Sequence, residues 1–535
     1  MKLERLPEYV TTFVVLTVGI VLAILCGQMT GEGQFKAVSA VVGIVLVLTI
    51  LLTLKTKIWL LLPLSWALQE YIPIIEVPLS YRDIFVVLTF GGYLLLYAFK
   101  ILRTKPKFET LDLIVLANVV YLATVYVRNP VGTKWMETEM VGGKPYFNVA
   151  MGFLAYWVLC RAPIHLKLMR WLPLFFLPGP TFVAIGTLMS EYIPGAASYL
   201  GIIYQDFAPP PPNAPINVDL IGRKPGLAEF GQKGIAVMCA YFSPVTLAFP
   251  FFPGRFIPAL IFFGAILWSG FRSILLSAFL YVLISNYFRK KVQESVVLIL
   301  VGLVAMGVLT VGNGNLFELP ISMQRALSFL PGKWDPIATS DAESSTVWRH
   351  EMWKIVLTEE KWIQNKWLGD GFGFRRLDFE IMQAAAEGGA GFIGAAQQES
   401  FMITGAFHSG PLSAIRFVGV IGLLLYLALL IYMARESIRL IRKCQQTPLF
   451  PVALFVGMPL IYRPIEYVFV FGGFDTALPT TFFMAGILKL LMRSQESENP
   501  DSLLSRQSMD LQLEEGKSLP SLRPVISRST QSFDS

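Results

Sequence analysis

Residues 411–434 read PLSAIRFVGVIGLLLYLALLIYMA, and Arg416 is the one charged residue among them. An α-helix rises about 1.5 Å per residue, so about 20 apolar residues are needed to cross the roughly 30 Å hydrocarbon core of a bilayer. The run is continuously apolar rather than alternating, which excludes a strand of a closed membrane barrel. This stretch therefore predicts a membrane-spanning helix, and similar runs recur along the chain.

The composition agrees with a chain that lies largely in lipid. Of the 535 residues, 15% are charged, whereas a typical soluble domain has about 25%. Hydrophobic residues make up 54% and the mean hydropathy is +0.58, which excludes a disordered chain and argues against an ordinary soluble protein. The four cysteines and three histidines have no metal-binding spacing, so we expect no metal and no cofactor. Much of the net charge of +7 lies beside apolar runs, where it sets topology and indicates no nucleic-acid partner.

Run length predicts an all-α integral membrane protein with about fourteen transmembrane helices. Lys and Arg are more frequent in the loops expected inside, as in the turn 289–291, than in the shorter outer loops. With an even number of spans, this bias places both termini in the cytoplasm. The predicted spans are 10–27, 36–54, 58–75, 84–101, 111–127, 147–163, 167–189, 233–250, 255–270, 272–288, 293–312, 411–434, 450–470 and 476–493.

These spans divide the chain into four regions. Residues 1–254 are expected to form an N-terminal transmembrane bundle, and 436–493 hold the last transmembrane helices. Between them, 255–435 contains one large outer loop, 313–405, in which short helices are expected. The tail, 494–535, is polar and rich in serine, which predicts disorder in the cytoplasm.

The large loop contains apolar residues at helical spacing. Ser340 and Glu343 have the spacing of a capping box, which predicts the start of a helix. That helix either lies on the outer membrane surface or packs against other helices, and the pattern leaves both open. Glycines over 369–373, and again from Gly388, suit a mobile segment over a site. The apolar positions of the helix are Trp348, Met352, Ile355 and Trp362.

Ionisable residues at or inside the membrane carry the candidate chemistry, because each costs about 2.5–3.5 kcal/mol at the bilayer centre. Arg272 stands between two apolar runs at the predicted outer face, and Arg416 lies about one turn inside the span after the large loop. Arg416 has no acidic residue three or four positions away, so it needs a partner from elsewhere, either protein or ligand. Arg463 and Glu466 can pair with each other on one helix face.

His408 lies just before the span that holds Arg416. Ser409 and Pro411 fit a helix start directly after it. A neutral imidazole there can accept a proton as a general base, or it can be an interfacial hydrogen-bonding residue. With several arginines beside it, a pocket at the outer face suits a phosphate-bearing substrate, because Arg binds phosphate oxygens in pairs. ATP is normally unavailable outside the cell, so the transferred group would come from an activated, membrane-borne donor.

These residues resemble the O-antigen ligase and O-antigen polymerase superfamily. His408-Ser409, nine residues, and then Gly419-Val-Ile-Gly422 reproduce the ligase pattern H[NSQ]-x9-G-x-x-G. Arg272 lies in a Ser-Gly-x-Arg-Ser run that resembles the surroundings of the family's first functional arginine. Arg349, four residues before Trp353, and the later Leu-Gly-Asp-Gly run resemble elements of the family's periplasmic loop. The similarity extends over about residues 255–435.

The resemblance implies a metal-independent glycosyltransferase with a GT-C-like fold in the bacterial inner membrane. Such enzymes move a glycan from undecaprenyl diphosphate to an acceptor hydroxyl of a lipid or glycan at the periplasmic face, as in lipopolysaccharide biosynthesis, and the expected course is a single displacement with inversion at the anomeric carbon. Carried over, Arg272 and Arg349 would hold the diphosphate, and His408 would act as the base or position the acceptor hydroxyl. Ser409, Gly419 and Gly422, the other residues of the ligase pattern, would have a supporting role in the site. Arg416 is added, from its place in the span, as a further diphosphate contact.

Three alternatives stay open at this point. A polysaccharide polymerase of the same superfamily would use the same donor chemistry. A flippase or transporter of lipid-linked glycans would have its charged cavity near the membrane midplane, whereas the candidate charges here lie at the predicted outer face. A structural membrane protein would need none of these residues for turnover.

Overall fold

The computed structural model describes residues 53–73, 79–102, 107–132, 140–207, 223–378, 380 and 393–498, together with scattered positions between 23 and 50. The predicted span 10–27 and nearly all of the span 36–54 therefore lie outside the described residues. The part of the predicted tail after Glu498 lies outside them as well.

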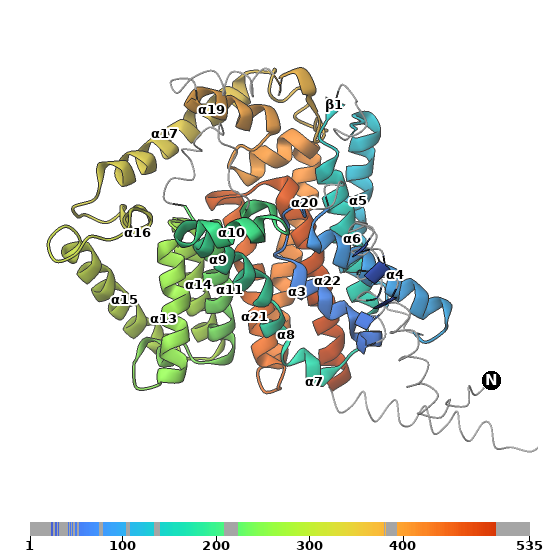
Figure 1. Cartoon of the computed structure of the whole chain (residues 1–535), viewed down its shortest axis with the longest axis horizontal. Coiled ribbons are helices and arrows are strands. Elements are labelled where there is room, and N and C mark those ends of the chain that lie inside the picture. The colour runs from blue at the N-terminus through green and yellow to red at the C-terminus, as the bar shows by residue number, and fades with distance from the viewer. Residues whose placement is uncertain are drawn as a thin grey trace, which may run out of the picture.

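The described chain forms a bundle of helices, with α17 and α19 lying beyond one end of it (Figure 1). The longer helices are α4 (Tyr81–Ala98), α5 (Thr110–Arg128), α6 (Lys144–Arg161), α9 (Pro178–Tyr192), α11 (Pro225–Tyr241), α13 (Pro253–Trp268), α14 (Arg272–Phe288), α15 (Val292–Gly312), α17 (Pro336–Thr358), α19 (Ile393–Thr404), α20 (Gly410–Cys444), α21 (Phe450–Ile465) and α22 (Phe474–Glu498). Short helices are η1 (Lys55–Leu60), α3 (Leu61–Ser65), α7 (Leu166–Met169), α8 (Leu172–Phe175), α10 (Pro194–Gly201), η3 (Gln205–Phe207), α12 (Val245–Ala248), α16 (Ile321–Leu327) and the π-helical turn η5 (Glu466–Val470). Strands β1 (Met140–Val141) and β2 (Phe374–Arg375) pair antiparallel.

The predicted fold class, a helical membrane protein, is confirmed, but the predicted number of spans is not tested. Among the described residues, seven helices are long and apolar enough to cross a membrane, and α13 and α14 are shorter apolar helices. The seven are α4, α5, the segment Leu172–Tyr192, α15, α20, the segment Phe450–Val470 and α22. The total of about fourteen spans, the sidedness of the loop 313–405 and the cytoplasmic termini stay predictions.

The predicted single span over 58–75 is wrong. The chain there forms the 3-10 helix η1 and the five-residue helix α3. Ile58, Trp59 and Leu62 are fully buried in the main hydrophobic core. The apolar run therefore fills the protein interior, and run length alone does not distinguish that role from a lipid-facing span.

The predicted span over 233–250 is also misplaced. Helix α11 begins at Pro225 and ends at Tyr241, and a separate short helix, α12, follows. Ser243 precedes Pro244, and a residue before proline disfavours the helical backbone, so the helix ends there. The shift matters because it brings Glu229 into the helix.

Helix α17 lies in the large loop, and it starts earlier than the predicted capping box at Ser340. Asp335 is the N-cap, and its Oδ1 accepts a hydrogen bond from the Ile337 backbone amide at 2.8 Å. Met352 and Val356 of this helix are buried in a cluster with Phe407. Of the two interpretations of this helix, packing against other helices is the one observed.

A buried ion pair ties α22 to α5 in the main core. Lys489 is 1% exposed, and its Nζ donates to the carboxylate of Asp112 and to the carbonyl oxygen of Lys107 at 3.0 Å. The Tyr156 hydroxyl from α6 donates to the same carboxylate. A buried cation is stable only with such partners, because removing it from water is costly.

Replacing Lys489 by methionine will leave the Asp112 carboxylate buried without its cation. We expect a loss of stability of about 3–5 kcal/mol, the usual effect of breaking a buried pair. The measurement is the thermal midpoint of the detergent-solubilised protein, and adding Asp112→Asn should recover part of the loss.

The matched control is Arg376→Met, which removes the cation of an exposed pair with Glu380. Exposed pairs contribute about 0–1 kcal/mol, so this midpoint should hardly move. Equal losses for the two variants would contradict the role given to the Lys489 pair.

Candidate active site

A cavity of about 460 Å³ opens where α11, α14, α16, α17 and η5 meet. It brings together three residues that the sequence predicted as a site: Arg272, Arg349 and His408. Its wall consists of Arg223, Pro225, Ala228, Glu229, Gln232, Gly270, Phe271, Arg272, Ser273, Ile274, Arg325, Arg349, His408, Glu466, Val470 and Phe471.

Arg272 is the first residue of α14, and the helix α16 holds its guanidinium group. Gly270 has φ 76°, a left-handed conformation that lets the chain turn between α13 and α14. Nε of Arg272 donates to the carbonyl oxygen of Arg325 at 3.2 Å, and Nη2 donates to Oγ of Ser328 at 2.7 Å. These bonds orient the planar guanidinium group, while the Arg325 side chain reaches the same cavity.

Arg349 comes from α17, which is fastened to the His408 segment one turn further on. Trp353 Nε1 donates to the carbonyl oxygen of Phe407 at 2.9 Å. Residues four apart lie on the same face of a helix, so docking Trp353 also directs Arg349 toward His408. The Arg-x-x-x-Trp spacing noted in the sequence therefore has a geometric reason.

His408 has an unusual backbone and a defined ring tautomer. Its φ is 55°, in the left-handed region that non-glycine residues rarely adopt. Its Nδ1 lies 2.8 Å from the carbonyl oxygen of Ala406, which can only accept, so the hydrogen of a neutral ring is on Nδ1. Nε2 is then the nitrogen that can accept a proton. The rings of Trp348, Phe401 and Phe471 surround the imidazole at 5.9, 4.9 and 5.6 Å.

Helix α20 begins directly after His408 and is interrupted at Gly419. The predicted start is confirmed, with Ser409 at the N-cap, although its side chain makes no capping bond with the described backbone. Gly419 has φ 70° and ψ −179°, a non-helical conformation inside the helix. Val420 N donates to Lys366 O at 2.9 Å, and Gly371 N donates to Phe417 O at 2.9 Å. The break therefore frees backbone N–H and C=O groups of α20, and these form hydrogen bonds with the segment 366–371.

Comparison with known families decides the identity of this region. Residues 257–427 match the family model described as O-antigen ligase. This segment belongs to the O-antigen ligase superfamily. A search of curated proteins finds no match to the chain. The resemblance seen over 255–435 is thus confirmed as to family.

The O-antigen ligase domain does not supply the whole cavity wall. Arg272, Arg325, Arg349 and His408 lie within the matched residues, whereas Glu229 on α11 lies before them. Further wall residues outside the domain are Arg223, Pro225, Ala228, Gln232, Glu466, Val470 and Phe471.

Arg416 has a protein partner and does not line the cavity. Its Nη1 lies 3.1 Å from Oδ2 of Asp370, and Nη2 donates to Gly373 O at 3.2 Å. The Asp370 carboxylate also accepts the backbone amides of Gln364 and Asn365, each at 2.8 Å. We therefore leave Arg416 out of the proposed diphosphate site. The partner that Arg416 was predicted to need is the Asp370 carboxylate, which lies within the same matched domain.

The motif glycines make this docking possible. A Cβ on Gly419 would lie 2.2 Å from the carbonyl oxygen of Trp367, and one on Gly369 would lie 2.5 Å from Gly419 N. A Cβ on Gly422 would meet the Tyr121 ring at 2.9 Å. The stretch 369–373, for which a mobile segment was predicted, packs against α20 through these contacts, and its mobility stays a prediction. Residues 388–391 of the second glycine-rich stretch lie outside the described residues.

One prediction concerns a charge pair deeper in the bundle. The expected pair of Arg463 and Glu466 is present, with Nη1 and Oε2 2.7 Å apart, and Glu466 also reaches the cavity. Sequence reasoning missed Arg325, which no spacing marks, and Glu229. An ionisable residue inside an apolar helix indicates function, but a span starting at 233 left Glu229 in the preceding loop.

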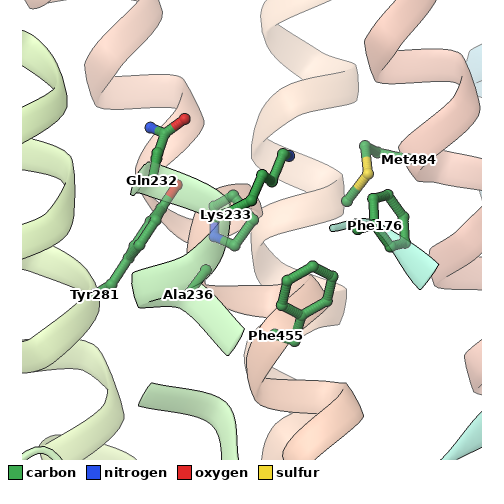
Figure 2. A pocket seen from close by; sticks show the side chains of 8 residues that line it. Phe176, Gln232, Lys233, Ala236, Tyr281, Phe455 and Met484 are labelled. Atoms are coloured by element: carbon green, nitrogen blue, oxygen red, sulfur yellow. The ribbon is translucent and has the colours of Figure 1, made fainter. Parts of the chain in front are cut away.

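A second, much smaller cavity lies around Lys233 (Figure 2). Gln232 lines both cavities, and its Nε2 donates to Oγ of Ser277 at 2.8 Å. The small cavity holds about 10 Å³, which is the space of about one water molecule and too little for a substrate. The large cavity, whose wall includes Gln232, is therefore the candidate site.

Replacing Gly419 by alanine will disrupt the O-antigen ligase domain. The new Cβ meets a backbone oxygen, and the positive φ is unfavourable for alanine, so we expect a loss of more than about 1 kcal/mol. The thermal midpoint of the solubilised protein measures it. Gly307→Ala in α15 is the control, because its Cβ would meet nothing within 4 Å. A Gly419→Ala variant as stable as the control would contradict the docking.

Proposed function

We propose that this protein is a glycosyltransferase that moves a glycan from undecaprenyl diphosphate to a hydroxyl group of a lipid or glycan acceptor. The observation that carries the proposal is the convergence of Arg272, Arg325, Arg349 and His408 on one cavity. The O-antigen ligase match supports the same class of reaction.

The arginines suit the leaving group of this reaction. Negative charge grows on the diphosphate as its bond to the sugar breaks, and oriented cations stabilise that charge most when they are held in place beforehand. Arg272 is held by two hydrogen bonds from its guanidinium group. Guanidinium groups bind phosphate oxygens in pairs, so the proposed mechanism needs no metal ion and no cofactor.

His408 supplies the base. Its Nε2 accepts the proton of the acceptor hydroxyl as that oxygen attacks the anomeric carbon of the donor sugar. The bond between the anomeric carbon and the diphosphate oxygen breaks, and undecaprenyl diphosphate leaves with the electron pair. One displacement of this kind inverts the anomeric carbon. Because Nδ1 is bonded to Ala406 O, the lone pair of a neutral ring is on Nε2.

The proposed orientation follows from the charge bias of the loops. The cavity is lined by Arg349 of α17, among residues of other helices, and α17 lies beyond one end of the helix bundle (Figure 1). We place this end at the periplasmic face of the bacterial inner membrane, with both termini in the cytoplasm. The donor diphosphate would then meet the arginines at the membrane surface while its polyprenyl chain stays in lipid.

His408→Ala will lower kcat by about 10²–10⁴-fold, the usual contribution of a general base, and will leave donor binding intact. Arg272→Ala will lower the transfer rate and will also weaken donor binding. The measurements are transfer of labelled glycan by the purified protein and donor affinity. His350→Ala is the control, because His350 is exposed on α17 and does not line the cavity. Full activity of both His408→Ala and Arg272→Ala would exclude the mechanism.

Cells that lack this protein will accumulate the substrate of the missing step. A ligase predicts long polymer on undecaprenyl diphosphate, and a polymerase of the same superfamily predicts single repeat units. Mass analysis of the carrier-linked glycans distinguishes them. Unchanged carrier-linked glycans would contradict both, and repeat units confined to the cytoplasmic leaflet would indicate a flippase instead.

A further inference from the structure

The π-helical turn η5 follows α21 directly and faces the cavity. It comes two residues after Pro464, which has no backbone N–H to continue the regular hydrogen-bond ladder. Such turns occur often at functional sites, because the extra residue redirects side chains. Here Glu466 and Val470 line the cavity, while Tyr467 is fully buried. The turn lies outside the O-antigen ligase domain.

Tyr467 contacts the segment that carries His408. Its hydroxyl donates to the carbonyl oxygen of Gly410 at 2.7 Å. A Cβ on Gly410 would lie 2.2 Å from the Tyr467 carbonyl oxygen, and a Cβ on Gly472 would lie 2.8 Å from the Tyr467 ring. Two glycines therefore let the tyrosine approach the backbone two residues after His408.

The His408 backbone needs such support. A non-glycine residue in the left-handed region is strained and persists only where its surroundings hold it. Three carbonyl oxygens in the segment 406–410 accept side-chain hydrogen bonds. The donors are the His408 ring to Ala406 O, Trp353 to Phe407 O, and Tyr467 to Gly410 O. Tyr467 is the anchor on the side where α20 begins.

We propose that Tyr467 is a positioning residue for His408: through the Gly410 carbonyl it fixes the direction in which the imidazole enters the cavity. This inference rests on the proposed function for its kinetic consequence. Its structural part, that Tyr467 sets the position of the His408 ring, can be tested without any activity.

The chain offers a matched control in Tyr426. This tyrosine is also fully buried, its ring lies 4.9 Å from that of Tyr467, and its hydroxyl is 2.9 Å from Oγ1 of Thr481. Tyr467→Phe and Tyr426→Phe each remove one buried hydroxyl and keep the ring. Only the first removes a bond to the His408 segment.

The kinetic test compares the two variants in glycan transfer. We expect Tyr467→Phe to lower kcat about tenfold with the KM for the donor unchanged, because a displaced base slows the chemical step more than binding. Tyr426→Phe should keep kcat within about twofold at a similar loss of thermal midpoint. Equal kcat values for the two variants would overturn the inference. Activity of His408→Ala would overturn the proposed function instead.

The structural test uses the three histidines of the chain, His165, His350 and His408. With ¹³C-labelled histidine in the detergent-solubilised full chain, His165→Asn, His350→Asn and His408→Asn assign the imidazole signals. Tyr467→Phe should shift or broaden the His408 signal and leave the other two, whereas Tyr426→Phe should leave all three. An unchanged His408 signal in Tyr467→Phe would overturn the positioning role, whatever reaction the protein catalyses.

Discussion

The site depends on a break in the backbone ladder of α20, the longest helix described. At Gly419 the helix stops bonding to itself and binds the segment that includes Lys366 and Gly371 instead. Asp370 in that segment neutralises Arg416, so one docking event satisfies both backbone and charge. The segment follows α17 in the chain, and Arg349 of that helix lines the cavity. Glycine is required at the break because a Cβ there would meet a carbonyl oxygen.

The cavity that results has two kinds of wall. Cations come from the start of α14, from α16 and from α17, as Arg272, Arg325 and Arg349. Carboxylates come from the bundle, as Glu229 and Glu466. Like charges repel strongly where water is scarce, so the arginines need neutral partners such as the carbonyl and hydroxyl that hold Arg272. A molecule with a phosphate group and hydroxyl groups has complementary features for both walls.

Local rules predicted local features well. The residues before Pro411 signalled a helix start, and α20 begins there. Arg463 and Glu466 were predicted to pair from their spacing, and they do. The rules failed where a helix end depended on its surroundings. Ser340 fits a capping box in isolation, but Asp335 already caps the helix before it. An apolar run beginning at Ile58 satisfied the length of a span, yet its side chains are buried in protein.

Hydropathy, charge bias and motif spacing were sufficient to predict a helical membrane protein of this superfamily and to propose as site residues Arg272, Arg349 and His408, which line one cavity. Those properties depend on residues that are near one another in the chain or on a recognised pattern. Only the tertiary structure could decide that Asp370 pairs with Arg416 and that Tyr467 bonds to the segment after His408. These partners are brought together by the docking of separate helices, and no spacing in the sequence records such long-range contacts.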